Sequence, residues 1–185
     1  LTVEKIGEEG QYMMDIAWPW RIVEAMQMMT RLKFLKIELN HCCSNEHLEA
    51  FAEGISGLKA IVNFQFHIEN PKENIEDFTY LKFLKSLKHI ARNLRDLSLM
   101  FIGCFGLSNK TLIQAKEAFI EMKKVSSLNI TARPVNIPVI NGQNKLKEYL
   151  KRFEPSVEMA KNIILNAFAK KKNIENLTVL LCESL

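Results

Sequence analysis

Apolar residues recur along the chain in five short segments that share one spacing. In each segment an apolar residue is followed by apolar residues three, five and seven positions later, and the segments begin at Leu32, Ile61, Leu94, Val125 and Ile174. The second apolar positions are separated by 29, 33, 31 and 49 residues. The end of each segment alternates with period two, which predicts a short strand. Regular spacing of a few tens of residues is typical of a solenoid.

Stretches with helical periodicity follow the predicted strands. Ser44 and Ser108 stand where side chains that cap helix N-termini are expected, and Ser44-Asn45-Glu46-His47-Leu48 resembles Ser108-Asn109-Lys110-Thr111-Leu112. The inward stripes predicted for these two helices are Leu48, Phe51, Ala52, Ile55 and Leu58, and Leu112, Ala115, Phe119, Met122 and Val125. A third helix is predicted over about 75–91, with Phe78, Leu81, Leu84, Leu87 and Ile90 or Ala91 inward.

Both ends of the regular region depart from the repeat. Pro19 is expected to start a helix that carries Ile22, Val23, Met26 and Met29. The neighbouring Trp18 and Trp20 fit either a partner anchor or the apolar end of a solenoid. Residues 133–173 form an insertion: Pro134, Pro138 and Asn141-Gly142 predict an irregular loop, and two helices follow, the second from about 156 to 172. Because the apolar spacing is interrupted at Leu1 and Val3, we expect the chain to be a piece of a longer protein.

A strand, a crossover helix and a parallel strand make a right-handed unit. Repeated without closure, these units stack with short parallel strands on the concave side and helices on the convex side. We therefore predict an α/β solenoid of about five to six repeats. It would form a single domain over 1–185, with the most regular repeats at 31–132, the insertion at 133–173 and the last strand at 174–185.

The spacing Leu-x-x-Leu-x-Leu-x-Leu-x-x-Cys, followed by a polar turn and a helix, resembles the leucine-rich repeat family and its ribonuclease-inhibitor-like subclass. In that family an Asn or Cys after the strand bonds the backbone of a neighbouring coil, and Cys42 and Cys104 stand at this position. Pro71 and Val135 replace it in the second and fourth repeats, where the resemblance implies a loosened turn. Proteins of this family are mostly interaction scaffolds, and the fold itself assigns no function.

Composition narrows the class of protein. Apolar residues at 48% and charged residues at 25% are ordinary globular values and argue against disorder. No apolar run approaches the roughly 18–20 residues that span a bilayer. The cysteines Cys42, Cys43, Cys104 and Cys182 do not form the framework of a small disulfide-rich domain. We therefore expect reduced thiols and an intracellular protein of the cytoplasm, with the nucleus as an alternative.

Alternation along the strands predicts which side chains face solvent on the concave side. Those residues are Lys36, Glu38, Gln65, His67, Ser98, Met100, Asn129, Thr131, Thr178 and Leu180. With one lysine and no aromatic residue, this set is unlike an RNA-binding face, which carries several cations and aromatic rings. It suits a protein segment better. The plainer interpretation, that these are only solvated strand positions, stays equally open.

A second candidate surface is the mildly basic C-terminal half, where Lys and Arg outnumber Asp and Glu by 14 to 8 over 93–185. Its densest cations are Lys145, Lys147, Lys151, Arg152, Lys170, Lys171 and Lys172. They fit a patch for an acidic partner or nucleic acid. They fit better as cations near a helix C-terminus, which the helix dipole favours.

The sequence shows no pattern typical of a catalytic or metal site. His41-Cys42-Cys43-x-x-x-His47 has ligand types that zinc uses, yet adjacent cysteines point in different directions and no second Cys-x-x-Cys pair is present. His67 and His89 have no recognisable nucleophile or acid partner, and no glycine-rich phosphate loop is present. We expect no enzyme activity, no cofactor and no bound metal.

These observations favour a non-catalytic protein–protein interaction scaffold, a subunit or module of a larger assembly. It would bind a protein partner through the concave sheet or the exposed ends. Two alternatives remain. One is a nucleic-acid-associated subunit that uses the basic C-terminal half, and the other, implied by the family resemblance, is a substrate-receptor module of a ubiquitin ligase.

Overall fold

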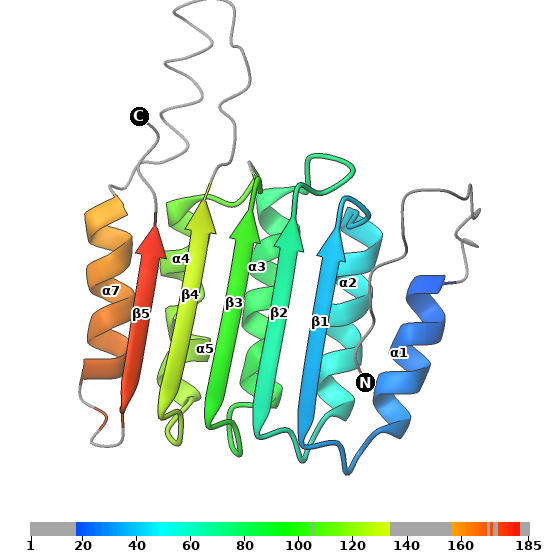
Figure 1. The fold of residues 1–185 in the computed structure, drawn as a ribbon, viewed down its shortest axis with the longest axis horizontal. Helices are drawn as coiled ribbons and strands as arrows, with labels where there is room; N and C mark the ends of the chain where they lie inside the picture. Colours follow the sequence, from blue (N-terminus) through cyan, green and yellow to red (C-terminus); the bar gives the residue numbers. More distant parts are fainter. Residues whose placement is uncertain (1–17, 105, 134–156, 170, 172–173, 182–185) are drawn as a thin grey trace, which may run out of the picture.

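The computed structural model describes residues 18–104, 106–133, 157–169, 171 and 174–181. Its centre is one five-stranded parallel sheet in which the strands stand in chain order, so each pairs with its neighbours in the sequence (Figure 1). The strands are β1 Phe34–Asn40, β2 Asn63–Glu69, β3 Asp96–Ile102, β4 Ser127–Arg133 and β5 Asn176–Leu181. All five coincide with the predicted segments, so the α/β class and the parallel sheet are confirmed.

The helices lie on one face of this sheet (Figure 1). They are α1 Trp18–Met28, α2 Asn45–Gly54, α3 Asp77–Ser86, α4 Asn109–Gln114, α5 Lys116–Glu121 and α7 Val157–Ala169, with short 3-10 turns η1 Ile55–Gly57 and η2 Leu87–His89. The predicted N-caps are confirmed, since the Ser44 hydroxyl accepts from the His47 amide and the Ser108 hydroxyl from the Thr111 amide. No described helix is long and apolar enough to cross a membrane.

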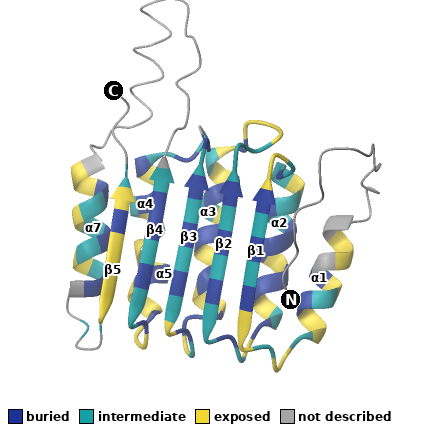
Figure 2. Cartoon of the chain, viewed as in Figure 1, coloured by how far each residue is buried: buried dark blue, intermediate teal, exposed yellow. Residues whose placement is uncertain are grey.

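The core lies between the sheet and the helices, and it is continuous from Met26 on α1 to Val179 on β5. Alternate strand residues enter it, as the burial pattern of β2 and β3 shows (Figure 2). Phe51 and Phe83 contact the Phe66 ring at centroid distances of 5.4 and 4.4 Å, which ties α2 and α3 to the middle of the sheet. The inward stripes predicted after Ser44 and Ser108 are buried in full.

The stripe predicted for the third helix is confirmed at Leu84, Leu87, Ile90 and Ala91, which are buried, and is wrong at its start. Phe78 was expected inward, yet 68% of its surface is exposed. On α3 the buried side chains are Tyr80, Phe83 and Leu84, which lie on the other side of the helix from Phe78. The stretch is apolar on two faces, so helical periodicity alone could not decide which face meets the sheet.

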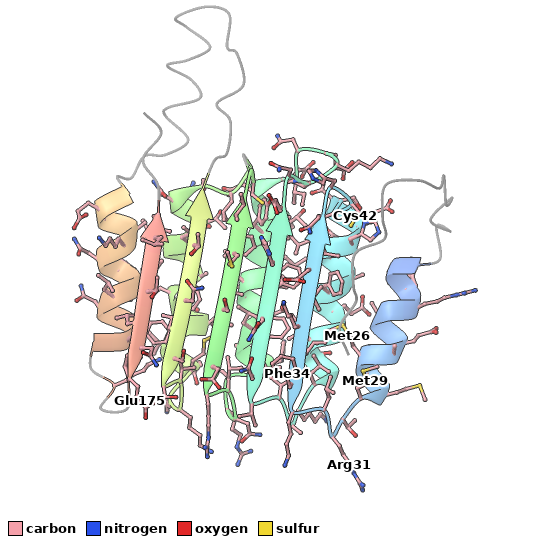
Figure 3. The ribbon with its side chains drawn as sticks, in the orientation of Figure 1. Met26, Met29, Arg31, Phe34, Cys42 and Glu175 are labelled. Carbon is pink, nitrogen blue, oxygen red and sulfur yellow. The ribbon has the colours of Figure 1, made fainter. Side chains whose placement is uncertain are left out.

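The first helix packs closely on the second. Val23 and Met26 are buried, as predicted, and Met26 lies between α1 and α2 (Figure 3). A Cβ atom at Gly57 would stand 2.5 Å from the Gln27 Cα atom, and one at Gly54 would stand 2.9 Å from the Met26 sulfur. These two glycines therefore allow the backbone of the α2–η1 segment to approach α1.

The turns at the carboxyl ends of β1, β2 and β3 share one backbone conformation. His41, Asn70 and Gly103 have φ values of 59°, 45° and 68°. The His41 amide donates to the Glu69 carbonyl at 2.9 Å, and the Asn70 amide to the Ile102 carbonyl at 2.8 Å. The shared conformation in the second repeat is at Asn70, the residue before Pro71, so the loosened turn expected from Pro71 stays a prediction. Val135 lies outside the described residues.

The insertion can be compared with its prediction only at its end. Helix α7 spans most of the predicted 156–172 helix, and its Ile164 and Phe168 are buried. The loop and the first predicted helix fall within 134–156, outside the described residues. The division into domain segments stays a prediction.

Candidate functional site

The face of the sheet opposite the helices is the candidate site, and we call it the open face (Figure 1). No described helix lies over it. The parallel register aligns its side chains into rows across the strands. One row consists of Lys36, Gln65, Ser98, Asn129 and Thr178; the next consists of Glu38, His67, Met100, Thr131 and Leu180. The structure thus brings together all ten residues that alternation placed on the concave side.

The open face extends further than the sequence analysis proposed, by one row at each end of the strands; the row at the carboxyl ends contains Asn40, Glu69, Ile102 and Arg133. Phe34, Asn63, Asp96, Ser127 and Asn176 form a row at the amino ends of the strands. Phe34 is 44% exposed and begins β1, whereas Cys42 lies past the other end of that strand (Figure 3). The alternation along each strand could have predicted the row at the amino ends, because Phe34 lies two residues before Lys36 and so faces the same side of the sheet.

Side chains on the open face hold one another in place. Asn129 donates to the Ser98 hydroxyl at 3.2 Å, and the Thr131 hydroxyl donates to the Asn129 side-chain carbonyl at 3.2 Å. Lys36 and Glu38 form an ion pair at 2.8 Å, and both side chains remain about one-third exposed. Thr131 is buried, so it differs from the solvated position that alternation suggested. The polar rows are largely preorganised, with little net charge at their centre.

The middle of the open face contains one polar atom without a partner. The Nε2 atom of His67 is buried and makes no hydrogen bond within the described residues. His67 stands between Glu38 on β1 and Met100 on β3 in its row. Buried polar atoms are usually satisfied by hydrogen bonds. This nitrogen is therefore an unsatisfied polar atom beneath the surface of the open face.

The last strand is more exposed than the others. Leu177 and Leu180 on β5 are 39% and 44% exposed, and most of the strand is accessible (Figure 2). Leu180 lies on the open face, and Leu177 points to the helix side, toward α7. Leu180 therefore adds exposed apolar surface to the open face at its β5 edge.

Only one residue of the predicted basic surface lies in the described part of the chain. Lys171 is half-buried, and its ammonium group donates to the Phe119 and Met122 carbonyls at 2.7 and 2.8 Å. The same nitrogen lies 3.9 Å from the centroid of the Phe168 ring. Burial lowers the pKa of Lys171 to about 8. Lys171, two residues beyond the end of α7, therefore connects this part of the chain to the end of α5. The other six cations, at Lys145, Lys147, Lys151, Arg152, Lys170 and Lys172, fall outside the described residues.

The two cysteines of the segment after β1, Cys42 and Cys43, pack in or against the hydrophobic core. Cys43 is buried and Cys42 is half-buried, and the described part of the chain contains no group of acidic, cysteine and histidine side chains suited to hold a metal ion. Burial raises the pKa of the Cys42 and Cys43 thiols, and that of Cys104 to about 12, so these thiols are poor nucleophiles. Burial also lowers the pKa of His47.

Comparison with known proteins identifies the architecture only. No protein-family model matches the chain, and no curated protein matches it. Among solved structures, the tropomodulin C-terminal domain of Caenorhabditis elegans is similar, with a TM-score of 0.51 and 13% identity over 89% of this chain and 84% of that one. A domain described as leiomodin-1 actin-binding site 2 is similar at a TM-score of 0.47 and 13% identity, over 82% and 87% of the two chains. The first likeness supports the fold, and the second is too weak to support an inference.

These comparisons overturn the family resemblance drawn from the sequence. The assignment to the ribonuclease-inhibitor-like leucine-rich repeat subclass is wrong, because no model of that family matches and the similar solved domain is from tropomodulin. The Cys104 thiol does donate to the Ile68 carbonyl of the neighbouring strand at 4.0 Å, and to the Ile102 carbonyl of its own strand at 3.6 Å. The contact expected at the ladder position is therefore present at Cys104, although the subclass assignment is not supported.

Proposed function

We propose that this chain is a non-catalytic protein-binding module that docks a protein segment on the open face. The observation that carries the proposal is the alignment of the open-face side chains into rows across five strands, with a hydrogen bond joining the rows of β3 and β4. Because Asn129, Ser98 and Thr131 already hold one another, little side-chain freedom is lost when a partner binds. The nearly neutral centre favours a polypeptide over a phosphate backbone.

The arrangement of the face indicates how a segment would bind. Hydrogen-bonded Ser98 and Asn129 offer fixed polar groups at the centre. Exposed Phe34 and Leu180 offer apolar contacts near opposite edges of the sheet. A segment crossing the strands would meet apolar, polar and apolar surface in turn. This combination of apolar anchors with a few fixed polar groups is common in protein recognition.

The same proposal extends to the whole molecule. We infer that the strand and helix units form an open solenoid of five to six repeats, and that it serves as a subunit or module of a larger assembly inside the cell. The stacking order of the five strands supports the solenoid. The absence of enzyme activity is part of the proposal, which the buried, weakly nucleophilic thiols support.

Site-specific photo-crosslinking tests the open face directly. A benzophenone amino acid replaces Gln65 or Ser98 in separate variants, and Glu117 on the exposed side of α5 in a matched control. Extract from the native source is irradiated with each variant, with and without nuclease. We expect one protein to cross-link to both open-face variants, resist nuclease and be absent from the control. Cross-links at Glu117 alone would contradict the proposal, and so would cross-links lost on nuclease treatment.

A further inference from the structure

A second surface lies in the helix layer, on the side of the molecule away from the open face. Helices α2 and α3 are neighbours behind β1, β2 and β3 (Figure 1). They border a groove of about 450 Å³ that continues along η2. The groove is lined by Ala52, Glu53, Phe78, Leu81, Lys82, Lys85, Ser86, Lys88 and His89.

The floor of the groove is apolar. Phe78 is 68% exposed, the most exposed aromatic ring among the described side chains, and Leu81 is half-buried beside it. Neither side chain belongs to the buried core, which takes Tyr80, Phe83 and Leu84 from the same helix. Phe78 and Leu81 stand three positions apart, so they form a stripe along α3. Within the part of the chain that the structure describes, this stripe stays outside the core.

The rim of the groove is positively charged. Lys82, Lys85 and Lys88 lie along it with His89, against a single acidic lining residue, Glu53. Lys82 is paired with Glu49 on α2 at 3.1 Å. Lys85 and Lys88 are exposed and make no ion pair within the described residues. Two unneutralised cations therefore flank the apolar floor, and the groove favours an acidic occupant.

We propose that this groove binds an acidic amphipathic helix of a partner protein. The helix would place its apolar face on Phe78 and Leu81 and its carboxylates beside Lys85 and Lys88, the helix-in-groove mode of recognition. The ten residues of α3 measure about 15 Å, so an occupant of about three turns matches the groove. This surface is separate from the open face and does not depend on the function proposed for it.

The composition of the groove separates a helix from other anionic ligands. A nucleic-acid surface would carry denser positive charge with arginine, whereas the groove has no arginine and already uses Lys82 in an ion pair. A membrane-binding surface would present its apolar residues on an outward-curved face, whereas Phe78 and Leu81 border a hollow. An apolar floor between cationic walls instead matches a helix that carries leucine and glutamate on adjoining faces.

Fluorescence anisotropy with a defined probe tests the proposal. The probe is a labelled synthetic peptide of about 14 residues, with leucines at helical spacing and glutamates flanking them. A peptide of the same composition with scrambled order is the control. Three variants are compared with the unmodified chain: Phe78→Ser, the double Lys85→Glu/Lys88→Glu, and the matched charge control Lys110→Glu/Lys116→Glu on exposed positions of α4 and α5. A thermal melt of each variant checks that it is folded.

The expected results form one pattern. The amphipathic peptide binds more tightly than the scrambled peptide, the Lys85→Glu/Lys88→Glu variant weakens binding about tenfold or more, and Phe78→Ser weakens it at unchanged thermal stability. The control pair changes binding less than about twofold, because only long-range charge is altered. Equal binding of both peptides, an equal loss in the control pair, or tighter binding of a single-stranded DNA of similar length would each overturn the proposal.

Discussion

The structure gives Lys171 a different role from the one that the sequence suggested. In the sequence it belongs to a run of lysines that suggests a charged patch. In the structure its ammonium group is bonded to the carbonyls of Phe119 and Met122, at the end of α5. Each of these carbonyls also accepts one backbone amide, from Met122 and Val125, so Lys171, two residues beyond the end of α7, adds a second donor at the end of α5. A cation that fastens two helices is not available to an acidic partner.

This arrangement predicts a pH-dependent stability. The folded chain holds Lys171 at a pKa of about 8, whereas an ordinary lysine titrates near 10.5. Between about pH 8 and 10.5 the unfolded chain binds a proton that the folded chain does not bind, so the contribution of Lys171 to the free energy of unfolding rises with pH in this window. Urea unfolding of the unmodified chain and of Lys171→Met, at pH 7 and pH 10, measures it. We expect the difference between the two proteins to shift in favour of the unmodified chain at pH 10. An equal difference at both pH values would contradict this assignment.

At the scale of elements, the two serine caps show how neighbouring units are joined. The Ser108 hydroxyl caps α4 and donates to the Asp77 carboxylate at 2.7 Å, and the Ser108 amide donates to the same carboxylate at 2.8 Å. Asp77 is the first residue of α3, so one serine links two consecutive helix starts. The Ser44 hydroxyl caps α2 without a carboxylate of this kind, and Asn45 makes the link to Glu73 instead.

The caps therefore predict unequal costs of substitution. Ser44→Ala removes a cap and should lower the free energy of unfolding by about 1 kcal/mol. Ser108→Ala should cost more, because it also removes a donor from the Asp77 carboxylate. Chemical denaturation of both variants measures the difference. If Ser108→Ala cost no more than Ser44→Ala, the link through Asp77 would add nothing to stability.

The elements that sequence predicted well are those with a single apolar face. Period two located every strand, because alternate residues such as Leu97 and Leu99 must enter one core. Helix α3 was placed correctly and its Leu84 is buried as predicted, but Phe78 was wrongly placed inward because it belongs, with Leu81, to a second apolar face outside the core. Because Phe78 and Leu81 were predicted to be buried, the sequence analysis did not identify the groove that they line. The left-handed backbone at Asn70 was not predicted, because it leaves no reliable mark in a single sequence.

At the scale of the molecule, the register of the five strands determines which side chains lie next to one another on the open face. Sequence could list the open-face residues strand by strand, but it could not say that Ser98 stands beside Asn129 or that His67 lacks a partner. Those facts depend on the alignment of four strand pairs. The same register places every core residue against a neighbouring unit, so no unit buries its apolar face alone.

This continuous core predicts that the domain unfolds as one unit when its centre is disturbed. Leu99 is fully buried on β3, so Leu99→Asp would place an unpaired charge in the core and should abolish cooperative folding. The milder Leu99→Ala should cost about 2–5 kcal/mol and keep a single, shifted transition. Gln65→Ala on the open face is the control, and it should change stability by less than about 0.5 kcal/mol. Thermal melts followed by far-UV circular dichroism, with calorimetry, measure all three. Two separate transitions in Leu99→Ala would mean that the units on either side of β3 are stable independently, and a large loss in Gln65→Ala would mean that the two faces of the sheet are assigned the wrong way round.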